Sequence, residues 1–377
     1  MKKLILSTFA SLCLLSAVSA LSWGGLLDNN STLSTNDDFS AWSLNQSNGI
    51  YLSVTSDLNE SGSLKFAAEG LYKYFLDCDF KNSDSKFKNV ADCDLFKISG
   101  DWVTGNGAIS LNAGRFLVSD FSGTVFSQTS DGLYLSYDSL KLNASLYAGY
   151  TGLLNRLNVS MVENEFEDDD QFYKLCPGFV PLAAGLSYKA LFETNTIGLQ
   201  GEVFVPVKEE NKIKAYGTLS LSGQIGTAGN YNAKFILGTE KFDGLMLDAK
   251  LDAGIFLNAS SMVSLGGEYV SGANGDIKPF VTISSRSFGH SGFSNGVIVP
   301  KASFMYAAGK LYANATEMVI VAMPEKEAKL DGFDTGINIL YNLFSDLQVG
   351  CDLSAYICTE EKARSNYSAT LKASLAF

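Results

Sequence analysis

Apolar and polar residues alternate along most of this 377-residue chain. In residues 245–257 the odd-numbered positions carry Leu, Ala and Ile, whereas Asp248, Lys250 and Asp252 occupy even-numbered positions. Successive side chains of a β-strand point to opposite faces, so this pattern predicts a strand with one apolar and one polar face. The same alternation predicts long strands at 64–75, 140–150, 212–224 and 347–357.

Shorter or weaker alternation predicts the remaining strands. These lie near 41–44, 50–58, 95–103, 108–117, 132–137, 183–192, 197–205, 232–238, 262–269, 278–284, 297–306, 311–321 and 334–344, and at the end of the chain. The count is about 18, within a range of roughly 16 to 20. Short and long connections alternate, except somewhere between Gly185 and Val297, and residues 153–161 fit either a strand or a loop.

The apolar content is spread over these short segments and is not collected into long runs. The chain is 46% hydrophobic and 18% charged, with 35 Gly and only 6 Pro. A transmembrane barrel requires apolar residues to be spread out in this way, because lipid-facing and lumen-facing residues alternate on every strand. We therefore predict an all-β fold, a transmembrane antiparallel up-and-down β-barrel over residues 41–377.

The beginning of the chain has the composition of an export signal. Lys2 and Lys3 precede a mostly apolar run, 4–15, and small residues follow up to Ala20. This arrangement predicts a signal peptide at residues 1–20 that is cleaved after Ala20. The apolar run is shorter than the roughly 20 residues that a membrane-spanning helix needs.

The end of the chain completes one more alternating strand. In residues 367–377 the odd-numbered positions, ending at Phe377, are apolar, and Ser and Lys occupy most of the others. A terminal aromatic residue on such a strand resembles the C-terminal assembly signal of bacterial outer-membrane β-barrel proteins, the porins among them. The resemblance implies a place in the bacterial cell outer membrane, contact with its lipid, and recognition of Phe377 by the barrel-assembly machinery.

Residues 21–40 are poor strand material. Trp23-Gly24-Gly25 is followed by a stretch rich in Asn, Ser, Thr and Asp. We expect this segment to be an N-terminal lead-in or a plug inside the barrel.

The polar faces of the predicted strands carry charges of both signs. If these faces line a lumen, they provide the pore-lining candidates Lys65, Glu69, Lys73, Lys141, Lys212, Lys214, Asp248, Lys250, Asp252, Asp352 and Lys372. Opposed charges across an aqueous bore resemble the field of diffusion porins, where charged rings set ion preference. Alternatively, these charges neutralise one another and only keep the interior hydrated.

The longest predicted connection is strongly acidic. Its candidate constriction residues are Glu163, Glu165, Glu167, Asp168, Asp169 and Asp170. In porins a long loop folds inward and narrows the bore. The alternatives are a divalent-cation site on the surface and a disordered external loop.

Five cysteines follow the predicted cleavage site. Cys78 and Cys93 flank a polar stretch, and a disulfide between them would be worth roughly 3 kcal/mol in the loop-entropy model. The pairing of Cys176, Cys351 and Cys358 stays open, and an odd number leaves at least one thiol without a partner.

Several functional classes find no support in the sequence. A net charge of −12 argues against a nucleic-acid partner. The single histidine, His290, lies in a Gly/Ser/Phe segment that misses the G-x-S-x-G pattern. No metal-ligand spacing or cofactor fingerprint is present, so we expect no enzyme, no metal and no cofactor.

The resemblance implies a porin-type channel for passive diffusion of small hydrophilic solutes or ions, and it is compatible with a homo-oligomer. One alternative is a plugged channel for hydrophobic substrates, similar to fatty-acid transporters, with residues 21–40 as the plug. Another is a surface adhesin that uses the barrel as a mount.

Overall fold

The computed structural model describes residues 21–157, 159, 161–162, 174–208, 211–286, 288, 296–324, 327–359 and 364–377. Within these ranges no helix is long and apolar enough to cross a membrane. Three sequence predictions fall outside them: the signal peptide at 1–20, the acidic residues 163–170, and the environment of His290.

The described chain forms eighteen strands in one antiparallel sheet. They are β1 Ser22–Asn36, β2 Trp42–Asp57, β3 Leu64–Asp79, β4 Asp84–Thr104, β5 Gly107–Ser119, β6 Ser127–Ser139, β7 Leu142–Tyr150, β8 Phe179–Leu191, β9 Asn195–Pro206, β10 Lys214–Ile225, β11 Gly229–Glu240, β12 Asp243–Asn258, β13 Ser261–Val270, β14 Val297–Ala308, β15 Leu311–Ala322, β16 Lys329–Asn342, β17 Leu347–Cys358 and β18 Asn366–Ala376.

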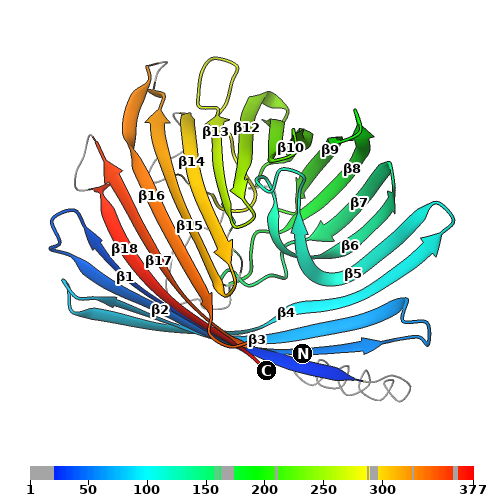
Figure 1. Cartoon of the computed structure of the whole chain (residues 1–377), viewed down its shortest axis with the longest axis horizontal. Coiled ribbons are helices and arrows are strands. Elements are labelled where there is room, and N and C mark those ends of the chain that lie inside the picture. Colours follow the sequence, from blue (N-terminus) through cyan, green and yellow to red (C-terminus); the bar gives the residue numbers. More distant parts are fainter. Residues whose placement is uncertain are drawn as a thin grey trace.

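The sheet closes on itself. Each strand pairs with the next in sequence, and β18 returns to β1 in a register that runs from Leu26 opposite Ala376 to Asn36 opposite Asn366. Figure 1 shows β18 beside β1 where the sheet closes. Closure pairs every edge, as a sheet in lipid requires. The predicted transmembrane-type barrel of 18 strands is confirmed.

The two faces of the barrel follow the alternation of the sequence. Large apolar residues such as Leu199, Leu251 and Leu265 are 56–64% exposed and point outward. Their neighbours along the strands, such as Gln200 and Lys250, point inward, where inward-folded connections contact them. The outer surface is therefore apolar along the strands and the interior is polar.

The connections differ between the two ends of the barrel. We call the end at which the described chain begins and finishes the near rim, and the opposite end the far rim. Near-rim turns have two to six residues: 58–63, 105–106, 140–141, 192–194, 226–228, 259–260, 309–310 and 343–346. Far-rim connections include the two longest, 151–178 and 271–296, together with the shorter 120–126.

The strand predicted at 278–284 was wrong, because these residues lie in the connection 271–296 between β13 and β14, and this extra strand broke the expected alternation of lengths between Gly185 and Val297. One far-rim connection in this region is also shorter than expected. Strands β11 and β12 are joined by the two residues Lys241 and Phe242, whose φ angles are 53° and 58°. Two successive positive φ angles are typical of the type I′ turn that closes a tight hairpin. A short turn thus occupies a position where a long loop was expected. The range 153–161 falls in the connection 151–178, and its described residues, 153–157, 159 and 161, belong to no strand.

The expectation that residues 21–40 form a lead-in or plug was wrong. Residues 22–36 form β1, which pairs with β18 on one side and with β2 on the other. Without β1 the edges of β2 and β18 would be left unpaired, and unpaired backbone groups in lipid cost several kcal/mol each. Backbone pairing therefore outweighs the weak strand propensity of this segment.

The predicted disulfide between Cys78 and Cys93 was also wrong. Both thiols are free, and the polar stretch between them continues strands β3 and β4 instead of forming a loop. Cys78 lies opposite Ser85, eight residues from Cys93 along β4. Eight residues of strand span about 26 Å, whereas the Cα atoms of a disulfide lie within about 7 Å.

Candidate functional site: a charged constriction inside the barrel

Three far-rim connections meet in the interior. The amide of Val162, from the connection 151–178, donates a hydrogen bond of 3.0 Å to the carbonyl of Ile283. The amide of Ile283, from the connection 271–296, donates one of 2.9 Å to the carbonyl of Val125. The side chain of Ser284 accepts a bond from the amide of Ser127 at 2.9 Å. Backbone pairing thus joins the three segments, and Figure 1 shows the teal 120–126 turn within the outline of the barrel.

Residues 120–126, here called the constriction segment, have their own internal support. The buried carboxylate of Asp120 accepts hydrogen bonds from the amides of Ser122 at 3.2 Å and Thr124 at 3.1 Å. The amide of Phe121 donates to the side chain of Gln200 on β9. The Phe121 ring packs on Gly185, where a Cβ would lie only 2.6 Å from it. A glycine on β8 therefore makes room for the aromatic ring against the wall.

An apolar cluster fills the space behind these segments. Val125, Phe280 and Ile283 are at most 2% exposed and contact the inner faces of the strands. The wall contributes large side chains at this level, among them Phe116, Tyr147, Phe204, Tyr216, Ile236 and Met246. Tyr216 also donates a hydrogen bond of 2.5 Å to the carbonyl of Val281. The inward segments are thus held by a packed core, which fixes the position of the polar groups at its edge.

Arg286 carries positive charge from the connection 271–296 onto the wall. Its guanidinium lies 3.2 Å from Asp248 on β12 and 2.5 Å from Glu268 on β13. Its Cζ lies 4.6 Å from the centre of the Phe288 ring. The side chain of Asp248 is fully buried, so the guanidinium compensates a carboxylate that water does not reach.

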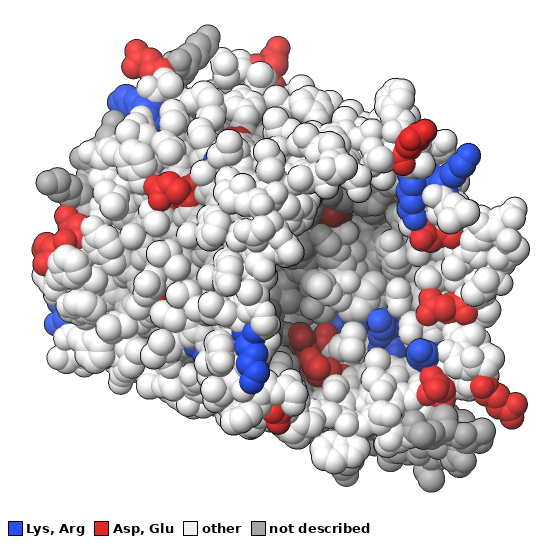
Figure 2. All heavy atoms as spheres, in the orientation of Figure 1, with Lys and Arg blue, Asp and Glu red and all other residues white. Residues whose placement is uncertain are grey.

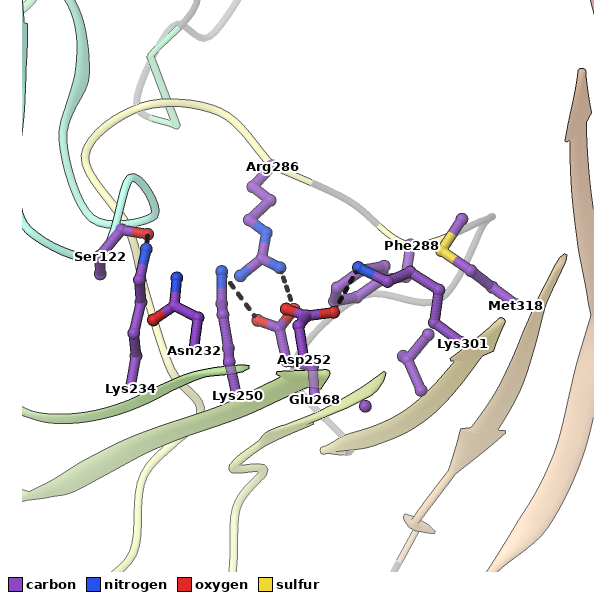
Figure 3. Close-up of a pocket in the computed structure, with 12 residues that line it drawn as sticks. Ser122, Asn232, Lys234, Lys250, Asp252, Glu268, Arg286, Phe288, Lys301 and Met318 are labelled. Carbon is purple, nitrogen blue, oxygen red and sulfur yellow. Dashed lines mark hydrogen bonds and ion pairs between the residues drawn. The ribbon is translucent and has the colours of Figure 1, made fainter. Parts of the chain in front are cut away.

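Three lysines complete the charges on this wall (Figure 3). Lys250 lies 3.4 Å from Glu268 and also donates to the hydroxyl of Thr124. Lys301 on β14 lies 2.8 Å from Asp252. Lys234 on β11 donates a bond of 2.9 Å to the carbonyl of Ser122. Two of the lysines therefore tie the constriction segment to the wall, as well as adding positive charge.

We call these residues the interior charge cluster: Lys234, Asp248, Lys250, Asp252, Glu268, Arg286 and Lys301. They comprise four cations and three carboxylates, a formal excess of one positive charge. Most of them line a cavity of about 300 Å³, together with Asn232, Phe288 and Met318. Figure 2 shows the molecule hollowed, with acidic and basic side chains inside the hollow. The cavity offers a small solute both cations and apolar surface.

A different sector of the interior is almost neutral. We call it the hydroxyl wall and define it by the inward residues Asn30, Thr32, Ser34, Ser43, Asn45, Ser47, Ser354, Ser368 and Thr370 of β1, β2, β17 and β18. Its hydroxyls bond across neighbouring strands, with 2.7 Å between Thr32 and Thr370 and 2.8 Å between Ser34 and Ser43. This wall can donate and accept hydrogen bonds while adding little charge.

The structure brings only some of the sequence candidates together. Asp248, Lys250 and Asp252 belong to the interior charge cluster. Asp352 and Lys372 form an ion pair with each other beside the hydroxyl wall. On β3, Lys65, Glu69 and Lys73 lie opposite Asp57, Ser53 and Gly49 of β2, on the face opposite to the outward Ile50 and Leu52.

The remaining candidates lie near the rims. Lys214 is buried at the far-rim end of β10, with its ammonium 5.4 Å from the centre of the Phe179 ring. Lys141 lies in the near-rim turn 140–141 and Lys212 in the far-rim connection 207–213, where it pairs with Glu240 at 2.8 Å. Both are outside the strands that were expected to carry them. Among the residues described, no three His, Cys, Asp or Glu side chains form a group that could hold a metal ion.

The sequence reasoning missed four members of the cluster: Lys234, Glu268, Arg286 and Lys301. Lys234, Glu268 and Lys301 occupy polar positions of strands that were predicted only weakly. The alternating pattern of these strands could therefore have placed all three on the inward face. Arg286 lies in a connection between strands, where the alternation of residues does not tell which way a side chain points. Only the fold shows that it contacts the wall.

Comparisons with known proteins find similarity in structure alone. No family model matches the chain, and no curated protein matches it in sequence. Solved structures from Pseudomonas aeruginosa do match over nearly the whole length. OccK11 (OpdR) has a TM-score of 0.62 at 14% identity, covering 95% of this chain and 96% of that one.

Two further structures give the same result. The outer membrane protein OprD matches with a TM-score of 0.61 at 12% identity, covering 96% of each chain. OccK2 (OpdF), solved in complex with glucuronate, matches with a TM-score of 0.60 at 16% identity, covering 96% of this chain and 98% of that one. The chain therefore has the porin-like fold of these barrels.

Proposed function

We propose that the chain is a porin-type channel of the bacterial outer membrane that passes small hydrophilic solutes by diffusion. A closed barrel with an apolar outer face and a polar interior suits this role. The observation that carries the proposal is the interior charge cluster beside the constriction segment, because charges at a narrow point set which solutes enter. The neighbours of this fold support the same role.

The cluster also suggests the class of solute. Its excess of one positive charge favours a solute with a carboxylate, since Lys234 bonds to a neutral carbonyl and can still attract an anion. The hydroxyl wall offers partners for a solute rich in hydroxyl groups. OccK2, which shares the fold, was solved with glucuronate, a sugar acid that has both features. We infer a preference for small hydroxylated acids over amines of the same size.

Bilayer recording of the refolded chain tests the channel. We expect steady ohmic current steps. Under a salt gradient, the sign of the reversal potential should show that anions permeate more readily than cations. Vesicle swelling then tests the solute class, with glucuronate entering faster than glucosamine and neutral glucose between them. A folded barrel that stays silent would refute the channel. Equal entry of all three sugars would refute only the preference.

Location and assembly form a second part of the proposal. We propose export through the signal peptide 1–20 and recognition of the C-terminal strand by the barrel-assembly machinery. Phe377 pairs with Gly25 of β1 through hydrogen bonds of 2.8 and 3.0 Å, so it lies at the closing seam. Deleting Phe377 should lower the yield of outer-membrane barrel while leaving export intact. Fractionation with immunoblotting would measure both.

The structure bears differently on the two alternative functions, the channel for hydrophobic substrates and the adhesin. The channel for hydrophobic substrates required residues 21–40 as a plug, but residues 22–36 of this segment form β1 of the barrel wall. The adhesin hypothesis remains a prediction, and grafting the 163–178 connection onto an unrelated barrel would test it.

A further inference from the structure

One arginine of the wall joins three neighbouring strands. Arg115 lies on β5, and its Nε and Nη2 donate to the two carboxylate oxygens of Asp131 on β6, at 2.8 and 2.9 Å. Its Nη1 donates to the carboxylate of Asp92 at 3.3 Å and to the carbonyl of Cys93 at 3.0 Å, both on β4. Two parallel bonds to one carboxylate fix the direction of a guanidinium as well as its position.

A further bond of Arg115 reaches outside the sheet. Its Nη2 also donates to the carbonyl of Leu153 at 3.1 Å, close to the start of the connection 151–178. A guanidinium has five N–H donors and no acceptor, so every donor of Arg115 has a protein acceptor. The side chain is 13% exposed. Arg115 therefore has no N–H group left for a solute.

Two irregularities of the backbone lie next to this arginine. Gly114 has a φ angle of 124°, and a Cβ there would lie 2.1 Å from the carbonyl oxygen of Phe96 on β4. Glycine alone allows β4 and β5 to approach so closely at this φ angle. A β-bulge follows Cys93 on β4, where Asp94 is the extra residue without a partner on β3. A bulge redirects the side chains beside it, and Asp92 is one of these.

The carbonyl that Arg115 binds belongs to a paired part of the connection. Residues 151–157 and 174–178, here called the root, lie side by side. The amide of Cys176 donates a hydrogen bond of 2.9 Å to the carbonyl of Leu154, and both residues are at most 5% exposed. The root is therefore a packed unit, and a bond to one of its carbonyls holds all of it.

The root leads to the narrow part of the interior. Beyond it the amide of Val162 donates to the carbonyl of Ile283, whose own amide donates to the carbonyl of Val125 in the constriction segment. Arg115 thus lies at the outer end of a continuous series of contacts that ends at the constriction segment. A series of packed and hydrogen-bonded groups can carry a displacement from one end to the other.

We propose that Arg115 is a positioning residue of the channel, which holds the root against β4–β6 and so sets the width of the passage without contacting the solute. The inference rests on the proposed channel function. Without the guanidinium, the carboxylates of Asp92 and Asp131 would repel each other, and the carbonyl of Leu153 would lose its donor. Both changes would release the root from the wall.

Hydrogen exchange of the full chain in detergent, measured by mass spectrometry, tests whether Arg115 holds the root. In Arg115→Met the amides of the root, such as that of Cys176, should exchange about tenfold faster than in the wild type, while those of β6 and β7 keep their rates. Lys189→Met is the matched control. Lys189 pairs with Asp138 of β6 near the near rim, so the loss of this ion pair should leave the root unchanged.

A conservative variant separates charge from geometry. Arg115→Lys keeps the positive charge beside Asp92 and Asp131, but its donors come from a single nitrogen and cannot reproduce the fork of a guanidinium. We expect its root amides to exchange at a rate between those of the wild type and Arg115→Met. Heat-modifiable gel mobility shows whether each barrel is folded. If Arg115→Met does not fold, faster exchange of the root in Arg115→Lys supports the proposal and a wild-type rate overturns it.

Single-channel recording under a salt gradient tests the consequence for the passage. Arg115→Met should give a larger and less steady conductance, because the connection is no longer held at the wall. The reversal potential should stay close to that of the wild type, since Arg115 has no N–H group left for the solute. A shift as large as that of Arg286→Met would place Arg115 in the solute path and overturn the positioning role.

Two results of the exchange measurement would also overturn the proposal. One is a root that exchanges at the wild-type rate in folded Arg115→Met. The other is equal acceleration of the root and of β6, which would mean that Arg115 only stabilises the sheet. A wild type that stays silent in bilayers would refute the channel itself, whereas the exchange rates would still decide whether Arg115 holds the root.

Discussion

The two walls of the interior are built from the same alternating strands and yet differ in how their polar groups are organised. On the hydroxyl wall, neighbouring strands satisfy one another, as Thr32 and Thr370 do, and no connection is needed to complete the pattern. On the charged wall, the fully buried Asp248 forms its ion pair with Arg286, which the connection 271–296 brings to it. Strands alone therefore make a hydrated lining, whereas strands covered by a connection make a defined site.

This difference assigns distinct roles to the two sectors. Charges that are covered and paired at 2.5–3.4 Å hold fixed positions beside the inward-folded connections. The side chain of Lys372, beside the hydroxyl wall, is 36% exposed, against 12–19% for Lys250, Glu268 and Arg286, so water and salt screen its charge more than theirs. Ion preference should therefore respond strongly to changes in the interior charge cluster and weakly to changes at Lys372.

Replacing Arg286 with Met should have the largest effect. The substitution keeps a long side chain but leaves Asp248 and Glu268 without their shared cation. Removing one partner of a buried ion pair typically costs about 3–5 kcal/mol. We expect the connection 271–296 to detach from the wall, the conductance to rise and the reversal potential to move toward cations. Single-channel recording under a salt gradient measures the last two.

Arg364→Met provides the matched control. Arg364 pairs with Asp331 at 3.3 Å near the far rim, away from the constriction segment. This variant should keep the reversal potential of the wild type. Equal shifts in the two variants would mean that total charge, and not the position of Arg286, sets ion preference.

The architecture was predictable because it depends on local alternation. The alternating positions of residues such as Leu251 and Asp252 showed which side chains share a face of a strand. The count of about 18 strands followed from the chain length and the number of alternating segments. Strand β1 was missed because closure, a property of the whole sheet, determines it. The β11–β12 turn was missed because Lys241 and Phe242 are not typical type I′ residues, although they adopt positive φ angles.

The site was less predictable for a physical reason. Alternation tells which face Lys250 and Asp252 share, but not which charges meet across strands whose register is unknown. The ammonium of Lys301 lies 2.8 Å from the carboxylate of Asp252. The two residues are brought together by β13, which lies between their strands and pairs with both in a specific register. Arg286 and the constriction segment depend on contacts between connections, and no periodic signal in the sequence encodes these.

Lys234→Gln should have the next largest effect on ion preference. Lys234 bonds to the carbonyl of Ser122, so its charge is not cancelled by that bond. Glutamine keeps a donor for the carbonyl and removes only the charge. We expect the ratio of anion to cation permeability to fall about two- to fivefold. Bilayer reversal potentials measure this ratio, and an unchanged ratio would show that Lys234 does not face the solute path.

Phe121→Ala should change the size of the passage more than its charge. The ring packs on Gly185 and Gly198, and its loss leaves the constriction segment with less contact to the wall. We expect higher conductance, by about twofold or less, with little change in reversal potential, because the charges near a pore set its selectivity. Phe304→Ala is the control, since that ring lies on the outer face and is 43% exposed. A rise in conductance in both variants would point to a general loosening of the barrel.

Lys372→Gln should have the smallest effect. Lys372 and Asp352 form an ion pair whose side chains are 36% and 31% exposed, and such exposed pairs contribute about 0–1 kcal/mol. The side chain of Asn338 also donates to Asp352, so the carboxylate keeps a partner in the variant. We expect the urea midpoint to stay close to that of the wild type and the reversal potential to shift less than in Lys234→Gln. A shift as large as that of Lys234→Gln would show that charges beside the hydroxyl wall act on the solute as strongly as those under the connections, and the distinction between the two walls would fail.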